Sequence, residues 1–432
     1  MMQRTILPVL SIALFSLPAL AAETALLDAL DASRIVAISD GDFVSSTYSD
    51  GALAPEGAGY RDLLTVLTRG SEGWTRAEVE ISNSVTAAPE ILVLDPSGRW
   101  AFVAERLEGR TANASVAADL APGSRVLAID LSDPFTPRLA FETRVMDLPD
   151  ALALSPDGRF LAVVGGTGAN ARIDILPFGA AGFGTPQQFP LGGLGLDDVA
   201  GPLSATNVHW HPRGDRLAVN LNRQNRVALL SFSEVEGLRL VGTPEMVGTD
   251  PFVGRFSADG RYYFTSDWGR NFEATSLEAR LPDRPSTLSV LSVGQDGLSN
   301  LGSVDSGESA EGLAVSPAGG LVATVNMDGT VLAGDRFSRH ATVALFQLDD
   351  TGGLNRLGLY PLEGVLPEGG SFDASGRHFL ATVFEGHDGA EPGKGAGLEV
   401  FAVTPESGHG SALKPLGRIP MPHGVHHVVI HP

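Results

Sequence analysis

Imidazole and guanidinium groups stand out at a few positions of a sequence that repeats one short apolar segment. His209, Arg255 and His427 lie inside such segments, where most repeats carry Ala, Gly or Ser. An imidazole can act as a general base and a guanidinium can hold an oxyanion, a combination that suits the opening of a lactone. The same groups can instead be structural residues that fill a pore. We predict His209, His427 and Arg255 as catalytic candidates, with Asn207 as a ligand-binding neighbour.

Acidic residues form a second candidate set, at the second position of the repeated segments. This position reads Glu90, Asp150, Thr206, Phe252, Glu311, Glu368 and His426. Carboxylates that converge on one point repel each other unless a cation lies between them, and oxygen ligands favour calcium over zinc. We therefore predict a divalent metal, calcium favoured, held by Glu90, Asp150, Glu311, Glu368 and His426. The alternative is that each acid caps backbone amides or pairs with a loop arginine such as Arg106 or Arg270.

Further ligand-binding candidates lie near the ends of predicted strands. Asp267 and Trp268 end one strand and Asn326 ends the equivalent strand of the next repeat, where these side chains can flank a ligand. The loop residue Arg106 completes this set. Phe252, the one aromatic residue of the second-position set, either stacks on a ligand or blocks the opening, and Trp268 equally fits an aromatic residue packed at the rim.

Seven octets that share one pattern position all of these residues. Two examples are Pro-Asp-Ala-Leu-Ala-Leu-Ser-Pro and Ala-Glu-Gly-Leu-Ala-Val-Ser-Pro, and successive octets lie 46 to 60 residues apart. In the first six, a turn of the Ser-Pro-Asp-Gly type follows the octet, and then a run of β-forming residues. The octets end at Pro96, Pro156, Pro212, Ala258, Pro317, Ala374 and Pro432. This period fits one four-stranded blade of a β-propeller.

The two ends of the chain are predicted to share the last blade. The seventh octet has no strands after it, whereas residues 34–38, 62–66 and 76–80 are β-forming runs without a blade. Joining them closes the ring and removes exposed sheet edges. The predicted fold is therefore all-β, a single seven-bladed β-propeller over residues 22–432, whose last blade combines the C-terminal inner strand with three N-terminal strands. Eight blades or two domains are the alternatives.

The repeat also carries a family resemblance. The pattern Pro-x-x-apolar, followed by Ser-Pro-Asp-Gly-Arg and by Gly-Leu hairpins, resembles the lactonase-like seven-bladed propellers, which include 6-phosphogluconolactonase-type proteins and periplasmic repeat propellers. The resemblance covers about residues 30 to 432 and implies the fold and a lactonase activity, a carboxylic ester hydrolysis. The stretch Asn207-Val-His-Trp-His-Pro is most similar to the His-containing repeat of the family, with Asn207 where the family often carries a His.

The spacing of the repeats indicates which face of the ring binds a ligand. Octet beginnings and the loops between second and third strands face one side, here called the top face, and the Ser-Pro-Asp-Gly turns face the bottom. Top loops are short at 166–170 and 221–225, and long at 40–61, 107–123, 268–285, 328–340 and 385–396. Insertions on one face of a repeat protein usually mark its binding face, although tolerated variation in loop length is the alternative.

Composition limits the partners and the compartment. The chain has 30 basic and 51 acidic residues, a formal net charge of −21, which excludes a nucleic-acid partner. It has no cysteine, which excludes disulfides and thiolate metal sites. Arg4, the apolar stretch from Ile6 to Leu17 and the sequence Ala19-Leu20-Ala21 are typical of an export signal over residues 1–21. We expect a monomer that is periplasmic or secreted and has no membrane span.

Two functions are compatible with these features. The first is an exported lactonase that hydrolyses a small, sugar-type lactone at the top of the central channel. The second is a non-catalytic periplasmic propeller that recognises a protein, a glycan or an envelope ligand through its long top loops.

Overall fold

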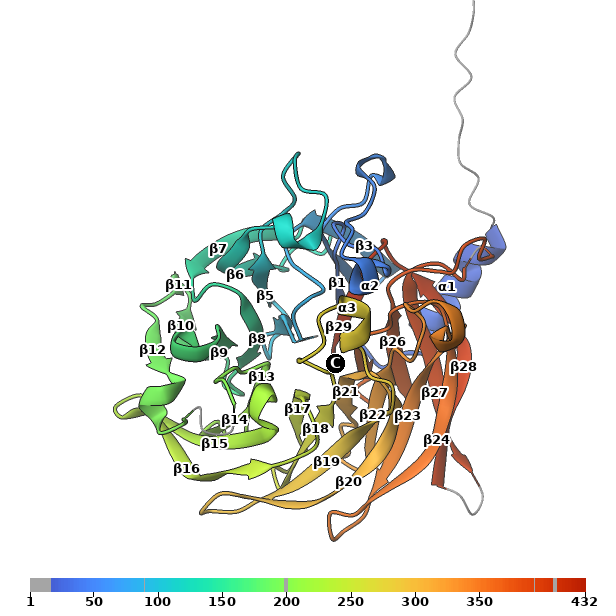
Figure 1. Ribbon diagram of the computed structural model, residues 1–432. Helices are drawn as coiled ribbons and strands as arrows, with labels where there is room; N and C mark the ends of the chain where they lie inside the picture. Colours follow the sequence, from blue (N-terminus) through green and yellow to red (C-terminus); the bar gives the residue numbers. More distant parts are fainter. Residues whose placement is uncertain (1–16, 89, 198–200, 392, 407–409) are drawn as a thin grey trace, which may run out of the picture.

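The computed structural model describes residues 17–432, except 89, 198–200, 392 and 407–409. Seven antiparallel sheets are arranged in a ring. Figure 1 shows this ring around one central axis, and the space along the axis between the innermost strands is called the central channel below. The prediction of a seven-bladed propeller is thereby confirmed. Six blades follow the chain in order, and the seventh combines its two ends.

The strands of the first three blades lie in the first part of the ring, with the first named strand of each blade innermost. The first blade contains β4 (Leu92–Leu94), β5 (Trp100–Leu107), β6 (Pro122–Asp130) and β7 (Arg138–Arg144). The second contains β8 (Pro149–Leu154), β9 (Phe160–Gly165), β10 (Arg172–Gly179), β11 (Gly182–Phe183) and β12 (Gln187–Pro190). The third contains β13 (Asn207–Trp210), β14 (Arg216–Leu221), β15 (Arg226–Ser233) and β16 (Gly237–Met246).

The next three blades continue around the ring. The fourth contains β17 (Pro251–Phe256), β18 (Tyr262–Asp267), β19 (Pro285–Val293) and β20 (Leu298–Glu308). The fifth contains β21 (Ala310–Val315), β22 (Leu321–Asn326), β23 (His340–Leu348) and β24 (Leu354–Glu363). The sixth contains β25 (Gly370–Phe372), β26 (His378–Val383), β27 (Gly397–Glu406) and β28 (Gly410–Pro420).

The seventh blade closes the ring as predicted, with the strand order β29–β1–β2–β3. Its strands are β29 (Val425–His431), β1 (Arg34–Ser39), β2 (Leu63–Gly70) and β3 (Gly73–Glu80). β29 pairs with β1 in antiparallel register, with Val429 opposite Val36. Both ends of the chain must therefore fold together, because neither β29 nor β1–β3 forms a complete blade alone.

The repeated turn has a clear local cause. Gly158, in the Ser-Pro-Asp-Gly turn of the second blade, has φ +74° and donates its N–H to the Ser155 carbonyl at 2.8 Å. Glycine adopts such a positive φ without the penalty that a side chain incurs. The Ser155 hydroxyl accepts the N–H of Phe160, where the second strand begins. The sequence thus ends the inner strand and starts the next one within a few residues.

Burial in the blades follows from their stacking in a ring. The second strands β9 and β18 are buried at every residue, because neighbouring blades cover both of their faces. This explains the continuous apolar runs in the sequence, since only strands with one solvated face alternate between apolar and polar residues.

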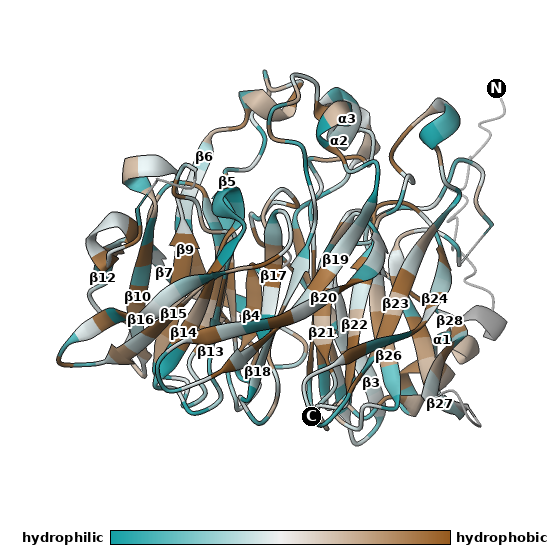
Figure 2. Cartoon of the chain, turned by 60° about the horizontal axis from the view of Figure 1, so that its bottom comes forward, coloured by the Kyte–Doolittle hydropathy of each residue, from teal (hydrophilic) through white to brown (hydrophobic). Residues whose placement is uncertain are grey.

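The long loops gather on the top face, which is the upper side of Figure 2. Two of them carry short helices, α2 (Thr47–Asp50) and α3 (Leu277–Arg280), which contact each other near the channel axis. The loops 107–123 and 328–340 carry single turns of 3₁₀ helix. The predicted asymmetry between the two faces is therefore present in the structure.

One helix lies outside the ring. Helix α1 (Leu17–Ala29) packs on β28, with Leu27 and Leu30 buried at its C-terminal side. It extends across the predicted cleavage position after Ala21; most of the predicted signal, residues 1–16, lies outside the described residues. No helix in the described part of the chain is long and apolar enough to cross a membrane.

Candidate functional site

The three predicted catalytic residues lie around the central channel. His209 is on β13, Arg255 on β17 and His427 on β29, all innermost strands. The Arg255 guanidinium forms an ion pair with Glu90, which precedes β4 on another side of the channel. The positive charge of Arg255 is close enough to lower the pKa of both histidines. The structure therefore brings His209, Arg255, His427 and Glu90 together.

Burial determines the protonation of these imidazoles. Burial, and secondly the charge of Arg255, lowers the pKa of His209 to about 3, and the same two causes lower the pKa of His427 to about 3. Both rings are therefore neutral at pH 7. Their Nδ1 atoms are buried without hydrogen-bond partners, while Nε2 of His427 lies 3.2 Å from the Leu92 carbonyl. Each ring thus keeps an unused polar atom.

The channel cavity lies nearer the bottom face than the sequence predicts. His209 and Arg255 line a cavity of about 250 Å³ together with Ser316, Pro317 and Ser371. Ser316 and Pro317 belong to a Ser-Pro turn at the bottom, so the cavity occupies the lower half of the channel. The reason is the fifth position in the octet, which lies past the middle of each inner strand. The predicted location at the top mouth does not match this cavity.

The predicted metal ligands have separate partners. Glu90 pairs with Arg255, and Asp150 pairs with Arg106 at 2.5 Å. Nε2 of His426 lies 2.9 Å from the Asn83 side-chain oxygen. The pairing of acids with loop arginines, left open by the sequence, therefore holds for Asp150, whereas Arg270 binds Asp250 instead. The rim residues in the described structure do not converge on one point, and calcium at the rim stays a prediction.

Two rim acids, Glu311 and Glu368, lie close to each other. Burial raises the pKa of Glu311 to about 8, and burial together with the charge of Glu311 raises the pKa of Glu368 well above its usual value. The Tyr48 hydroxyl on α2 lies within hydrogen-bond distance of both Glu368 and the Val85 carbonyl. The Tyr48 hydroxyl has a single hydrogen, so it cannot donate to both acceptors. A protonated Glu368 donates to the Tyr48 oxygen while Tyr48 donates to the Val85 carbonyl, and all three groups then have a hydrogen bond. Burial below the top loops therefore favours the protonated forms of this pair.

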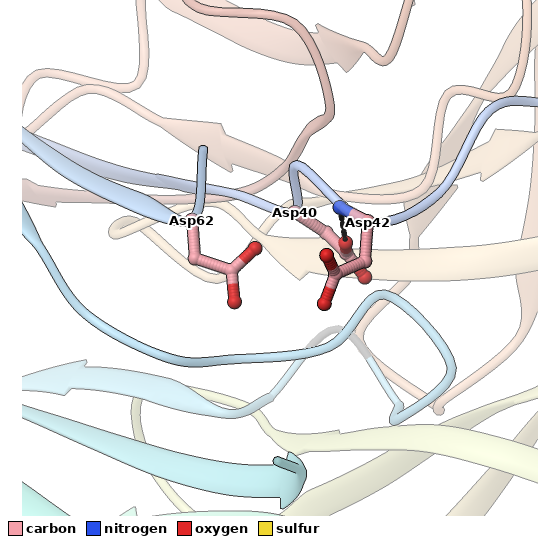
Figure 3. A group of neighbouring side chains, drawn as sticks. All are labelled: Asp40, Asp42 and Asp62. Atoms are coloured by element: carbon pink, nitrogen blue, oxygen red, sulfur yellow. Dashed lines mark hydrogen bonds between the residues drawn. The ribbon is translucent and has the colours of Figure 1, made fainter. Parts of the chain in front are cut away.

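Three other carboxylates could hold a cation. Oxygen atoms of Asp40, Asp42 and Asp62 lie within 4.8 Å of one another, and Figure 3 shows the three side chains turned toward each other. Asp40 accepts backbone N–H groups from Asp42, Phe43 and Val85, and burial raises its pKa to about 7. These amides already stabilise the charge of Asp40. No repeated pattern in the sequence points to these three residues, because they lie in and beside a loop outside the octets.

The top mouth of the channel is covered by aromatic side chains. Phe252 packs against Trp268 with ring centroids 4.6 Å apart, and the Arg270 guanidinium lies over the rings of both. A cavity of about 210 Å³ lies here, lined by these three residues, by Phe43 and Tyr48 and by Leu277 of α3. Phe252 therefore packs at the opening and also lines this cavity, so its stacking on a ligand stays a prediction.

The other predicted ligand-binding residues are dispersed. Asn207 is buried in the interior, where its side-chain oxygen accepts the N–H of Gly254. Asn326 is buried as well and donates to the Ser306 carbonyl and the Thr342 hydroxyl. Both therefore connect strands. Asp267 instead lines a cavity of about 640 Å³ on the top side of the fourth blade.

Comparisons with solved structures give the class of this fold. A periplasmic gluconolactonase from Pseudomonas aeruginosa superposes with a TM-score of 0.61 and 18% identity over 92% of this chain and 99% of that protein. A putative 6-phosphogluconolactonase from Bacteroides uniformis gives 0.60 and 12% identity over 92% and 99%. One from Bacteroides fragilis gives 0.58 and 14% identity over 92% and 98%. No protein-family model and no curated protein matches the sequence.

These likenesses confirm the resemblance found in the sequence. The chain has the fold of the lactonase-type seven-bladed β-propellers over nearly its whole described length. At these identities the likeness concerns the fold, so the chemistry has to be argued from the residues of this chain.

Proposed function

We propose that this protein is an exported lactonase that hydrolyses a small, sugar-type lactone in the lower half of its central channel. The observation that carries the proposal is the placement of the Arg255 guanidinium against Glu90 and near two neutral imidazoles, beside a cavity of about 250 Å³. A cavity of this size is at the lower end of what small-molecule sites enclose. The lactonase-type neighbours of the fold support the same reaction class.

The chemistry assigns one role to each residue. His209, neutral at pH 7, takes a proton from a water molecule as the oxygen of that water bonds to the lactone carbonyl carbon. Arg255 stabilises the oxyanion of the tetrahedral intermediate. When the ring C–O bond breaks, the proton on His209 passes to the departing ring oxygen, and the product is a hydroxy acid. His427 is the second candidate base, since its Nδ1 is also without a partner.

The low pKa of His209 makes it a weak base in the resting site. Burial is the main cause of that low value, and the positive charge of Arg255 adds to it. Negative charge that develops at the guanidinium offsets this effect, so the imidazole becomes more basic as the intermediate forms. Glu90 holds the guanidinium in place before substrate binds. Export is supported by the signal-like pattern of residues 1–21 and by the periplasmic neighbour.

The experiment is a pH-stat assay of glucono-1,5-lactone, 6-phosphoglucono-1,5-lactone and galactono-1,4-lactone with purified protein. We expect acid release above the spontaneous rate, and its loss in the double variant His209→Ala/Arg255→Ala. A matched double variant of exposed residues, His340→Ala/Arg239→Ala, keeps the wild-type rate. Equal rates for wild type and the channel variant with all three lactones would remove the enzymatic proposal and favour a binding propeller.

A further inference from the structure

The cavity beside Asp267 is separate from the cavity at His209, whereas it shares Arg270 and Leu281 with the smaller cavity at the top mouth. It measures about 640 Å³ and shares no lining residue with the channel cavity. Its walls come from the end of β18, from the loop 268–285, from Ser303 on β20 and from Arg336 of the fifth blade. The reaction proposed above does not use it.

The wall of this cavity is held in a fixed shape. The Arg336 guanidinium donates to the carbonyl oxygens of Leu281 and Pro282 at 3.2 and 2.6 Å, which ties the loop of the fifth blade to that of the fourth. The Ser286 hydroxyl donates to the Trp268 carbonyl at 2.7 Å on the opposite side of the same loop. A cavity formed before the ligand arrives avoids the entropic cost of ordering a loop upon binding.

The two less exposed guanidinium groups in the wall are already engaged. Arg270 forms a bidentate pair with Asp250 at 2.7 and 3.1 Å, and Arg336 donates to backbone carbonyls. Arg284 lies at the edge of the cavity, where 83% of its side chain is exposed. A phosphate or carboxylate inside the cavity would need free donors of the kind that Arg270 and Arg336 no longer offer, so the interior is poorly suited to an anionic ligand.

One carboxylate oxygen in the wall has no hydrogen-bond partner. Asp267 lies in the wall with 1% of its surface exposed; its Oδ2 accepts the hydroxyls of Thr287 and Ser289 at 2.8 and 2.6 Å, but its Oδ1 has no partner. A buried acceptor without a partner costs free energy, and a hydroxyl donor would recover it. Thr249, Asn271 and Ser303 add further hydroxyl and amide groups to the lining.

We propose that this cavity binds a small uncharged polyhydroxylated molecule, a monosaccharide or cyclic polyol, through a hydroxyl group that donates to Asp267. The polar groups in the wall and the paired guanidinium groups select a ligand rich in hydroxyls and without net charge. Because the cavity is distinct from the cavity at His209, this inference does not depend on lactone hydrolysis. The ligand would bind on the top face, where the long loops gather.

The test is isothermal titration calorimetry, supported by thermal shift, with D-glucose, D-galactose, D-mannose, D-xylose and myo-inositol as probes, and with glucose 6-phosphate for the charged class. We expect at least one uncharged probe to bind, and glucose 6-phosphate to bind at least tenfold more weakly than glucose. Ser303→Trp fills the cavity from an exposed position and is expected to abolish binding without changing the melting temperature of the free protein. Asp267→Asn is expected to weaken binding at least tenfold.

Two controls complete the experiment. Asp328→Asn changes a half-buried carboxyl group that also accepts a threonine hydroxyl but does not line the cavity, and it keeps wild-type binding. Arg255→Ala, in the channel, keeps it too, so failure of the proposed hydrolysis leaves this result unaffected. The proposal is overturned if none of the five uncharged probes binds, if glucose 6-phosphate binds more tightly than glucose, or if Ser303→Trp binds the sugar as well as wild type.

Discussion

The Arg255 guanidinium on the fourth blade forms an ion pair with the Glu90 carboxylate of the first blade inside the central channel. The two residues are 165 positions apart in the sequence. The two residues meet only when the ring is closed. The site proposed for hydrolysis therefore forms only in the completely folded propeller.

The first prediction concerns this pair. Removing one partner leaves a buried charge uncompensated, which typically costs about 3–5 kcal/mol, whereas replacing both with apolar residues of similar size is close to neutral. We expect Arg255→Ala to lower the free energy of unfolding by that amount and Glu90→Leu/Arg255→Met to lower it by less than half as much. Urea denaturation measures both. Equal losses in the two variants would contradict the prediction.

A second prediction concerns pH and Asp267. Burial raises the pKa of this carboxyl group to about 7 in the folded protein, from 3.8 in the unfolded chain. Between these values the folded state binds more protons, so this group lowers stability as the pH rises from about 4 to 7. We expect the stability of wild type, relative to Asp267→Asn, to fall across this range when urea unfolding is measured at pH 4.5, 5.5 and 7.5. A difference that stays constant or rises with pH would show that Asp267 is not buried in this way.

A third prediction concerns the contact between α2 and the channel. Tyr48→Phe removes the hydroxyl that lies between Glu368 and the Val85 carbonyl, and a buried group that loses its partner costs about 1–3 kcal/mol. Tyr60→Phe is the matched control, because Tyr60 is 43% exposed and its ring stacks on His423. We expect thermal or urea unfolding to show a clear loss for Tyr48→Phe and less than about 0.5 kcal/mol for Tyr60→Phe. Similar losses of unfolding free energy in both variants would show that the hydrogen bonds of Tyr48 do not stabilise the position of α2.

A fourth prediction concerns the glycine beside the closing strand. Gly424 has φ +85°, and a Cβ atom there would overlap the Asp40 carbonyl, to which the chain must pass close in order to begin β29. Gly424→Ala combines backbone strain with overpacking and is expected to cost about 3 kcal/mol. Gly389→Ala has the same type of φ, +73°, with nothing within 4 Å, and is expected to cost about 1 kcal/mol. Urea unfolding measures both variants. Equal losses of unfolding free energy would show that Gly424 does not pass close to the Asp40 carbonyl.

A fifth prediction concerns calcium at the rim. Among the rim acids, Glu311 and Glu368 lie together, and neither forms an ion pair with an arginine in the part of the chain that the structure describes. The charge of Arg270 acts on Glu311, but burial outweighs it, so the raised pKa values favour protonation at pH 7. Calcium would compete with that proton, so we expect calcium to raise the melting temperature more at pH 8.5 than at pH 6.5, and EDTA to reverse the effect. Glu311→Gln is expected to abolish the response, and Asp42→Asn, in the separate loop group, to retain it. An unchanged melting temperature at both pH values would remove the rim metal.

The candidate site was only partly predictable from the sequence. The octets correctly placed His209, Arg255 and His427 at the channel. Side chains alternate between the two faces of a strand, so the octet pattern predicts which residues of an innermost strand face the axis. Tyr48, Asp250 and Arg270 were not predicted as site residues, since they lie in loops or connections without a repeated pattern. The Asn207 side-chain oxygen and the Asn326 amide nitrogen make hydrogen bonds between strands, whereas Nδ2 of Asn207 is buried without a partner, so ligand contact by these two residues stays a prediction.

The sequence by itself determined the number of blades, their order and the way the two ends join. These properties depend on local signals, apolar strands separated by turns such as Ser155–Gly158, and a period repeated often enough to be read without knowing any contact. Only the tertiary structure decided which acid pairs with which arginine, that the cavity at His209 lies in the lower half of the channel, and that Asp267 belongs to a separate cavity. These contacts depend on how far each side chain extends and on which groups the closed ring buries together. Glu90 and Arg255, for example, come from different blades, and no local sequence pattern indicates that they meet.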